Sequence, residues 1–174
     1  MTEPRSGLVV RAGMPSDQPA VLTLNNASTP HVNALADEQF AWLATHADFY
    51  RVAEVHGVLS GFAMAIRHGT AYWSGNYAWF GERYDAFLYL DRIVVAADAR
   101  RVGVGRTLYA DLVRYATGCW PRITLEVNVE PPNPGSLAFH DRLGFLCVGT
   151  RRYADGEVAM FERTLGVSST PLTR

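Results

Sequence analysis

The chain has 174 residues and a formal net charge of −1, with 48% hydrophobic and 19% charged residues. This composition is typical of a globular domain, and the near-neutral charge argues against binding to nucleic acid or an anionic membrane through bulk electrostatics. No apolar run approaches the roughly 18 residues of a membrane span, and the polar start lacks a signal-peptide core. We therefore expect a cytoplasmic protein with no nucleic-acid partner and no membrane partner.

The predicted elements alternate along the chain. The first half is predicted to contain a strand over 7–12, a helix that is entered at 14–17 and runs to about Asn26, a helix over 37–45, and paired strands over 49–55 and 58–66. Residues 68–85 carry many aromatic side chains without a clean period, which favours a functional loop. The second half is predicted to contain a strand over 87–95, a helix over 104–117, a strand over 123–129, a helix from Asn133 to Gly144, and a hairpin of 145–151 with 157–165.

This order predicts an α/β fold in which a mixed, mostly antiparallel sheet carries helices on both faces. We expect one domain over residues 7–165, with flexible ends at 1–6 and 166–174. Cys119 and Cys147 lie in apolar surroundings without a metal-ligand spacing, so they are expected to be small buried residues. Neither a metal site nor a catalytic thiol is predicted.

Gly103 and Gly105 follow the apolar strand that ends at Val95 and open the next helix. The first N–H groups of a helix lack internal partners, and glycines let an anion approach the backbone, so this arrangement suits a pyrophosphate. The alternative is a tight turn between strand and helix. A nicotinamide dinucleotide loop is disfavoured because Arg106-Thr107-Leu108 supplies no third glycine.

The motif Arg100-x-x-Gly103-x-Gly105, directly after an apolar strand, resembles the acetyl-CoA pyrophosphate loop of the GNAT superfamily of N-acetyltransferases. A second resemblance follows in Leu125-Glu126-Val127 and the stretch 133–145, which ends in Gly144-Phe145. Together the two matches cover residues 88–145. The resemblance implies the GNAT fold, with a splay in the sheet at the acetyl-CoA site, and acetyl-CoA as co-substrate without a metal.

The resemblance also implies which residues bind the donor. The strand before the loop would contact the pantetheine arm through its backbone, and the loop would hold the pyrophosphate. The expected donor-binding residues are Ile93, Val94, Val95, Arg100, Arg101, Val102, Gly103, Val104, Gly105, Arg106, Asn133 and Ser136.

Two residues match catalytic positions of the family. Glu126 matches a glutamate that several members use as general base, since the attacking amine must lose a proton. The alternative is a glutamate on the solvent side of an alternating strand. His140 stands where many members have a tyrosine that protonates the leaving thiolate; imidazole could fill that role or act as a base, and the alternative is a structural histidine.

The acceptor pocket of the family is walled by the first two helices and by the loop between the third and fourth strands. The resemblance therefore points to Asn25, Asn26 and the aromatic segment that contains Tyr72 and Trp73. Tyr89 and Asp91 are further candidates, because they alternate on the strand beside the proposed thioester with Arg92 facing the other way; the alternative is a buried charge pair. Aromatic rings suit an apolar or cationic amine. The rings could equally form a dimer contact or pack on one another, and Asp91 is a second candidate for the base.

These features predict an acetyl-CoA-dependent N-acetyltransferase that acts on a primary amine by direct attack in a ternary complex. The acceptor would be a small molecule or a peptide, and a homodimer stays open. A catalytically silent acyl-CoA-binding module of the same fold is the alternative, since the family's tyrosine is replaced by His140.

Overall fold

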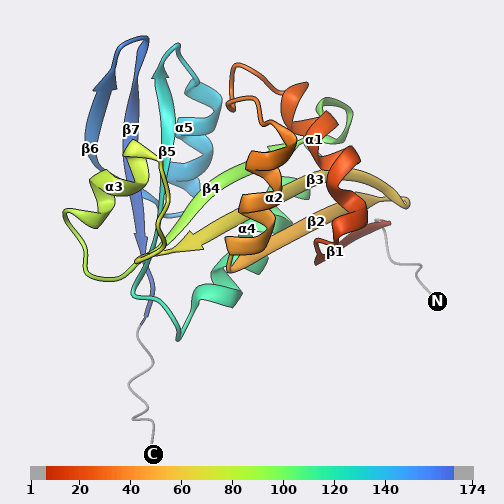
Figure 1. Cartoon of the computed structure of the whole chain (residues 1–174), viewed down its shortest axis with the longest axis horizontal. Helices are drawn as coiled ribbons and strands as arrows, with labels where there is room; N and C mark the ends of the chain where they lie inside the picture. The colour runs from red at the N-terminus through yellow and green to blue at the C-terminus, as the bar shows by residue number, and fades with distance from the viewer. Residues whose placement is uncertain (1–6, 167–174) are drawn as a thin grey trace, which may run out of the picture. The chain divides into compact units, whose positions relative to one another are not determined.

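The computed structural model describes residues 7–166, so the flexible ends expected at 1–6 and 166–174 lie outside the described residues except for Gly166. The described strands are β1 (Leu8–Ala12), β2 (Phe49–Val55), β3 (Val58–Arg67), β4 (Leu88–Val95), β5 (Arg122–Glu130), β6 (Leu146–Tyr153) and β7 (Gly156–Thr164). The α-helices are α1 (Gln18–Asn26), α2 (Asp37–His46), α3 (Gly75–Gly81), α4 (Val104–Ala116) and α5 (Pro134–Arg142), and short 3₁₀ turns lie at Pro15–Asp17 and Ala97–Ala99 (Figure 1).

The seven strands form one sheet in the order β1-β2-β3-β4-β5-β7-β6. β1 with β2, β2 with β3, β5 with β7 and β6 with β7 are antiparallel, whereas β4 and β5 run parallel with Tyr89 opposite Thr124. The fold is thus a mixed, mostly antiparallel α/β sheet with helices, as predicted. By its contacts the described chain divides into two compact units, residues 7–66 with 90–112 and residues 67–89 with 113–166.

Two expectations were wrong. Residues 68–85 are not without regular structure, because helix α3 lies within them and begins where the Ser74 hydroxyl accepts a hydrogen bond from the Tyr77 N–H. Seven residues are too few for a visible helical period. Cys119 and Cys147 are exposed rather than buried. Cys147 lies on β6, the last strand in the sheet order, where apolar neighbours in sequence do not imply a covered side chain.

The first unit carries helices on both faces of its strands. A Cβ on Gly61 of β3 would lie 2.8 Å from Val104 and 3.4 Å from Leu108, so α4 packs against that face. Tyr50 of β2 meets Phe40 of α2 edge-on at 6.1 Å between ring centroids. Tyr50 pairs with Met64, three positions along β3 from Gly61, so successive-residue alternation places α2 on the opposite face from α4.

The second unit has the same two-sided arrangement. Trp79 of α3 packs on Gly149 of β6, whose partner on β7 is Met160. His140 of α5 packs its ring 6.1 Å from that of Phe161, the next residue of β7. Because consecutive side chains of a strand point to opposite faces, α3 and α5 cover different faces of the β5–β7–β6 ladder.

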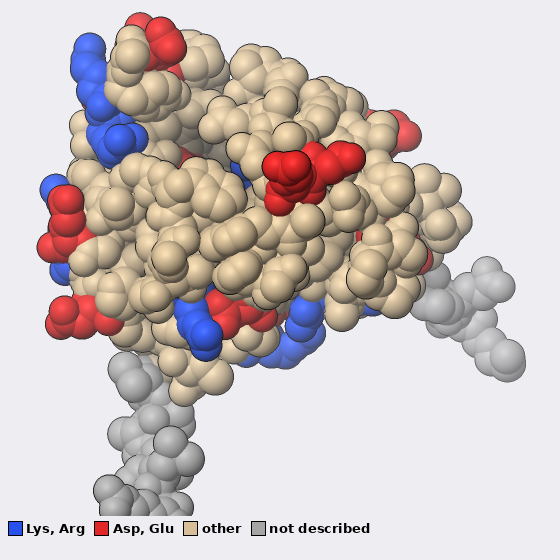
Figure 2. Space-filling model, viewed as in Figure 1, with Lys and Arg blue, Asp and Glu red and all other residues tan. Residues whose placement is uncertain are grey.

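The surface in view carries scattered charges. Figure 2 shows the arginine side chains in several separate places on this face, with Asp and Glu between them. This distribution agrees with the net charge of −1. Among the helices formed by residues 7–166, none has the length and apolar character needed to cross a bilayer.

Candidate active site

The predicted donor loop lies in the first unit. β4 ends at Val95, a 3₁₀ turn covers Ala97–Ala99, and α4 begins at Val104. Between them Arg101 and Gly103 have φ angles of +69° and +99°. The Gly103 carbonyl accepts the Thr107 N–H at 2.9 Å and its hydroxyl at 3.0 Å, so Gly103 closes the first turn of α4.

Strand β3 lies close to the residues on either side of the donor loop at Gly61. Gly61 of β3 faces both sides of the loop, since a Cβ there would lie 2.8 Å from the Val104 side chain and 3.0 Å from the Val94 carbonyl oxygen. A larger residue at 61 would push the start of α4 away from the strands. The side chains of Arg100, Arg101 and Arg106 are exposed to solvent. The first helical N–H groups and three guanidinium groups therefore supply positive charge at one end of α4.

The predicted acceptor residues of the first unit form a polar network. Arg92 donates from Nε to Asp91 at 3.1 Å and from Nη1 to the Asn25 side-chain oxygen at 2.9 Å and the Asn33 carbonyl at 2.8 Å. The fully buried Asn25 donates in turn to the Asn33 carbonyl at 3.0 Å. The Asn26 amide binds both the N–H and the carbonyl of Leu35.

Sequence reasoning predicted Asn25, Asn26 and Asp91, and its alternative of a buried charge pair here agrees with the Asp91–Arg92 contact. It missed the bonds of Arg92 to Asn25 and Asn33. The network ties the connection between α1 and α2 to strand β4. The side chains of Asn25 and Asn26 therefore use hydrogen-bonding groups to fix this connection. Asp91 forms a largely buried ion pair with Arg92, in which the side chains are 6% and 10% exposed. These contacts are typical of residues with a structural role, here fixing the connection between α1 and α2 against β4.

The predicted base lies in the second unit and has a bound partner. Glu126 lies half-buried on β5, opposite Met160 of β7, on the face that α3 covers. The Tyr89 hydroxyl donates to its two carboxylate oxygens, at 3.0 Å to Oε1 and 2.8 Å to Oε2. Because Tyr89 is fully buried, a carboxylate bound to its hydroxyl does not simply point into solvent, in contrast to the alternative of a solvent-side glutamate.

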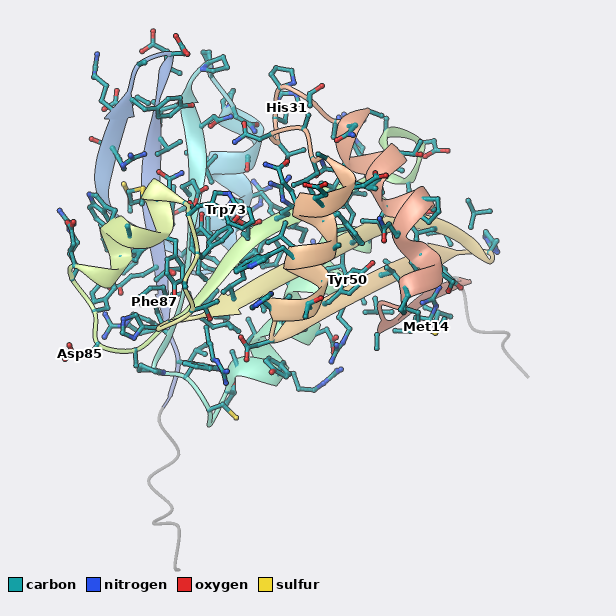
Figure 3. The ribbon with its side chains drawn as sticks, viewed as in Figure 1. Met14, His31, Tyr50, Trp73, Asp85 and Phe87 are labelled. Atoms are coloured by element: carbon teal, nitrogen blue, oxygen red, sulfur yellow. The ribbon has the colours of Figure 1, made fainter. Side chains whose placement is uncertain are left out.

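Aromatic rings surround this pair. Tyr72 contacts Trp73, Tyr77 and Tyr89 at centroid distances of 4.8, 5.7 and 6.4 Å. Trp73 is 55% exposed, whereas Phe87, beyond α3, is fully buried; Figure 3 labels both. The two predicted acceptor rings thus lead from the surface toward Tyr89. Sequence reasoning missed Ser74, whose Oγ lies 3.5 Å from the Tyr89 hydroxyl; a serine before Gly-Asn is a helix-start signal that could have indicated it.

His140 lies on the other face of the same ladder. It is 5% exposed, and its ring packs edge-on against Phe139 and Phe145. Its Nδ1 lies 2.8 Å from the Ser136 carbonyl, and since a carbonyl only accepts, Nδ1 carries the hydrogen. Burial lowers the pKa of the imidazole below its usual 6.5, against a smaller raising effect of that hydrogen bond. The neutral ring is favoured, with Nε2 as an acceptor.

The start of α5 is as predicted. Asn133 accepts the Ser136 N–H at 3.3 Å through its side chain, and Pro134 takes the first helical position. Ser136 also places its hydroxyl 3.3 Å from His140 Nδ1. The structure thus joins Asn133, Ser136 and His140 on α5, and joins Tyr89 with Glu126 on the opposite face. Within residues 7–166 there is no cluster of His, Cys, Asp and Glu that could hold a metal ion.

Solved structures share this fold. An N-acetyltransferase from Staphylococcus aureus Mu50 aligns with a TM-score of 0.70 and 22% identity over 91% of this chain and 99% of its own. The ribosomal-protein-S18-alanine N-acetyltransferase from Escherichia coli aligns with a TM-score of 0.70 and 18% identity, over 96% and 99%. Arabidopsis thaliana NAA60 in complex with acetyl-CoA aligns with a TM-score of 0.72 and 19% identity, over 91% and 99%. The architecture is therefore that of N-acetyltransferases.

The family follows from the sequence itself. The model of the acetyltransferase (GNAT) family matches residues 20–145, which span both predicted motifs. The chain belongs to this family and is an acyltransferase. No curated protein matches the sequence.

Proposed function

We propose that the chain is an acetyl-CoA-dependent N-acetyltransferase in which a primary amine attacks the thioester directly in a ternary complex. Residues 7–165 would form one acetyltransferase domain. The observation that carries the transfer chemistry is Glu126, a half-buried carboxylate held by the Tyr89 hydroxyl beside aromatic rings that lead to the surface. NAA60, which shares the fold, was solved with acetyl-CoA, and this supports the choice of donor.

Donor binding rests on the loop between β4 and α4. In this proposal the backbone of Ile93, Val94 and Val95 contacts the pantetheine arm as an added strand would. The pyrophosphate lies against the N–H groups from Val102 to Gly105, where the positive φ of Gly103 turns the backbone into the helix. Arg100, Arg101 and Arg106 add charge at the rim, and Asn133 and Ser136 are proposed to contact the donor from the start of α5.

Starting from an ammonium group, the nitrogen must lose two protons and the departing thiolate must gain one. Glu126 accepts the first proton from the ammonium group, and the neutral amine attacks the acetyl carbon. The new C–N bond forms as the C–S bond breaks, CoA leaves as a thiolate, and the acylated nitrogen releases its second proton to solvent. Because a thiol has a pKa of about 8.5, the thiolate is a tolerable leaving group at neutral pH and takes its proton from solvent. His140, favoured in its neutral form, would act as an acceptor or support α5 rather than donate this proton.

The acceptor is proposed to be an amine that reaches Glu126 past Tyr72 and Trp73. The polar network of Asn25, Asn26 and Asp91 would hold the wall formed by the connection between α1 and α2. Asp91, already in an ion pair with Arg92, is the weaker candidate for the base. The S18-alanine N-acetyltransferase is a neighbour named for a protein acceptor, so peptides with free N-termini belong in the test beside small amines.

The test begins with calorimetric titration of the protein with acetyl-CoA, with NADH as control. CoA release is then measured with spermidine, free lysine, kanamycin and short peptides that carry a free N-terminal Met or Ala. We expect Glu126→Gln to bind acetyl-CoA as the wild type does and to lose about 10²- to 10⁴-fold in kcat, the usual contribution of a general base. Glu130→Gln, an exposed position on the same strand, is the matched control and should keep full activity.

Each outcome separates the candidates. No acetyl-CoA binding would contradict the donor loop. A silent module, which the replacement of tyrosine by His140 favours, would bind acetyl-CoA and release no CoA with any amine. A Glu126→Gln variant with wild-type kcat would remove Glu126 from the role of base.

A further inference from the structure

Tyr89 is held in one position on the α3 side of β5. It is fully buried, and rings surround its own: Tyr77 at 5.6 Å and 78°, Phe80 at 6.2 Å, and Tyr72 at 6.4 Å between centroids. The parallel register places Tyr89 opposite Thr124, two residues before Glu126. The ring therefore has no room to turn away, and its hydroxyl stays at the carboxylate of Glu126.

The direction of the hydrogen bond is fixed by chemistry. An ionised carboxylate only accepts, so the phenol donates its single proton to Glu126 and bridges the two oxygens at 3.0 and 2.8 Å. The Ser74 hydroxyl, 3.5 Å from the phenol oxygen, can then only be the donor to Tyr89. Ser74 also accepts the Tyr77 N–H at the start of α3. Ser74 at the start of α3 thus contacts the Tyr89 hydroxyl, and that hydroxyl in turn holds the Glu126 carboxylate.

A bridging donor restricts how a glutamate can move. A glutamate side chain has three rotatable bonds, and ordering a long side chain costs conformational entropy. A base works only when it is held within reach of the proton that it takes, and small displacements of reacting groups cost large factors in rate. Contact with the phenol does not by itself prevent proton transfer, because each carboxylate oxygen can accept two hydrogen bonds.

We propose that Tyr89 is a positioning residue that orients the Glu126 carboxylate toward the amine and acts through Glu126 alone. This assigns Tyr89 a role other than the direct acceptor contact expected from the sequence, because a fully buried ring is placed to hold a neighbour rather than to meet an incoming molecule. The inference rests on the proposed function, in which Glu126 is the base.

The test compares Tyr89→Phe with Tyr84→Phe. Tyr84 is a suitable control because its half-buried ring lies under Arg122, which binds Glu162 of the same ladder, outside the proposed site. With the panel amine that gives the fastest CoA release, we expect Tyr89→Phe to lose about 10- to 100-fold in kcat, the value of one hydrogen bond to a charged group. The KM for acetyl-CoA and the calorimetric affinity should change less than about twofold, and Tyr84→Phe should keep the wild-type kcat.

A double variant tests whether Tyr89 acts through Glu126. In a Glu126→Gln background, Tyr89→Phe should cost no further activity, whereas independent roles would multiply their losses. If Tyr89→Phe does not fold, Glu126→Asp provides a second route. Because aspartate is one methylene shorter, this variant moves the carboxylate away from the Tyr89 hydroxyl. It should lower kcat without changing the affinity for acetyl-CoA.

Three results would overturn the inference while leaving the proposed function intact. These are a wild-type kcat for folded Tyr89→Phe, a loss confined to the KM of the amine, and additive losses in the double variant. Failure of the proposed function has a different signature. The wild-type protein would then not bind acetyl-CoA, would release no CoA with any panel amine, or would keep its full rate as Glu126→Gln, and the inference would fall with it.

Discussion

Replacing Gly103 with Ala tests the donor loop, and the chain supplies a matched control at the other end of the same helix. Gly103 precedes α4 with φ +99°, and Gly118 follows it with φ +82°. A Cβ built at either position meets no described heavy atom within 4 Å. Both substitutions therefore impose backbone strain without a clash, and only Gly103 lies in the proposed pyrophosphate loop.

The size of each effect can be worked out from this geometry. Holding an L-residue in the left-handed region costs about 1–2 kcal/mol, which in a protein of this size lowers Tm by about 2–8 °C. Ala at position 103 can relieve the strain by rotating φ to a negative value, which turns a backbone N–H away from the donor. Losing one hydrogen bond to a charged group costs about 1.5–3 kcal/mol, or about 10- to 150-fold in Kd.

The assay is calorimetric titration of both variants with acetyl-CoA, alongside thermal unfolding without ligand. We expect Gly103→Ala and Gly118→Ala to lose similar amounts of stability, and only Gly103→Ala to lose affinity. Wild-type affinity in a folded Gly103→Ala variant would refute the loop assignment. An equal loss of affinity in Gly118→Ala would show that the effect is global destabilisation.

Two further predictions concern stability against pH. Burial lowers the pKa of His140 below 6.5, so on acidification the unfolded state takes up a proton before the folded state does, and the free energy of unfolding should fall as pH drops below about 6.5. In denaturant titrations at several pH values, His140→Asn should lose this pH dependence. The variant His31→Asn, at an exposed histidine, should keep it. The Arg11 guanidinium holds the pKa of Asp17 below 3.8 through two hydrogen bonds of 2.8 Å, so this contribution is present above that pH and is lost as pH falls through the lower folded value. Asp17→Asn should lower the free energy of unfolding by about 1.5–3 kcal/mol at pH 7 and should weaken the loss of stability at acid pH. If Asp17→Asn and the surface variant Asp141→Asn lost stability equally with acidification, the role of the Arg11–Asp17 pair would be contradicted.

Local signals predicted most of the fold because they act within a few residues. Asn133-Pro134 begins α5 through a side-chain cap that the sequence spells out, and Gly118 follows α4 with the positive φ that glycine adopts readily. Helix α3 was missed because seven residues are too few to show a helical period, although Ser74 marks its start. The exposure of Cys147 depends on which strand ends the sheet, and strand order is not a local property.

The candidate site was predicted less completely, for the same reason. The sequence shows that Glu126 alternates with buried Leu125 and Val127, which fixes a face but not what covers it. Its contact with Tyr89 spans 37 positions and depends on the parallel register of β4 and β5. The Asn25–Arg92 bond spans 67 positions and has no sequence signal of its own. Motifs identify residue types for the chemistry, whereas their partners come from tertiary pairing.

The sheet also separates the two residues that motif matching grouped as catalytic. Glu126 faces the α3 side with Met160, and His140 packs on Phe161 from the α5 side. A family tyrosine, with a pKa of about 10, is protonated at neutral pH and can donate to a thiolate. A buried imidazole whose hydrogen is committed to the Ser136 carbonyl cannot do so in its neutral form. In the proposed mechanism, a histidine at this position therefore supplies no acid, and the thiolate takes its proton from solvent. The proposed base, Glu126, and its partner Tyr89 lie on the other face and do not depend on His140.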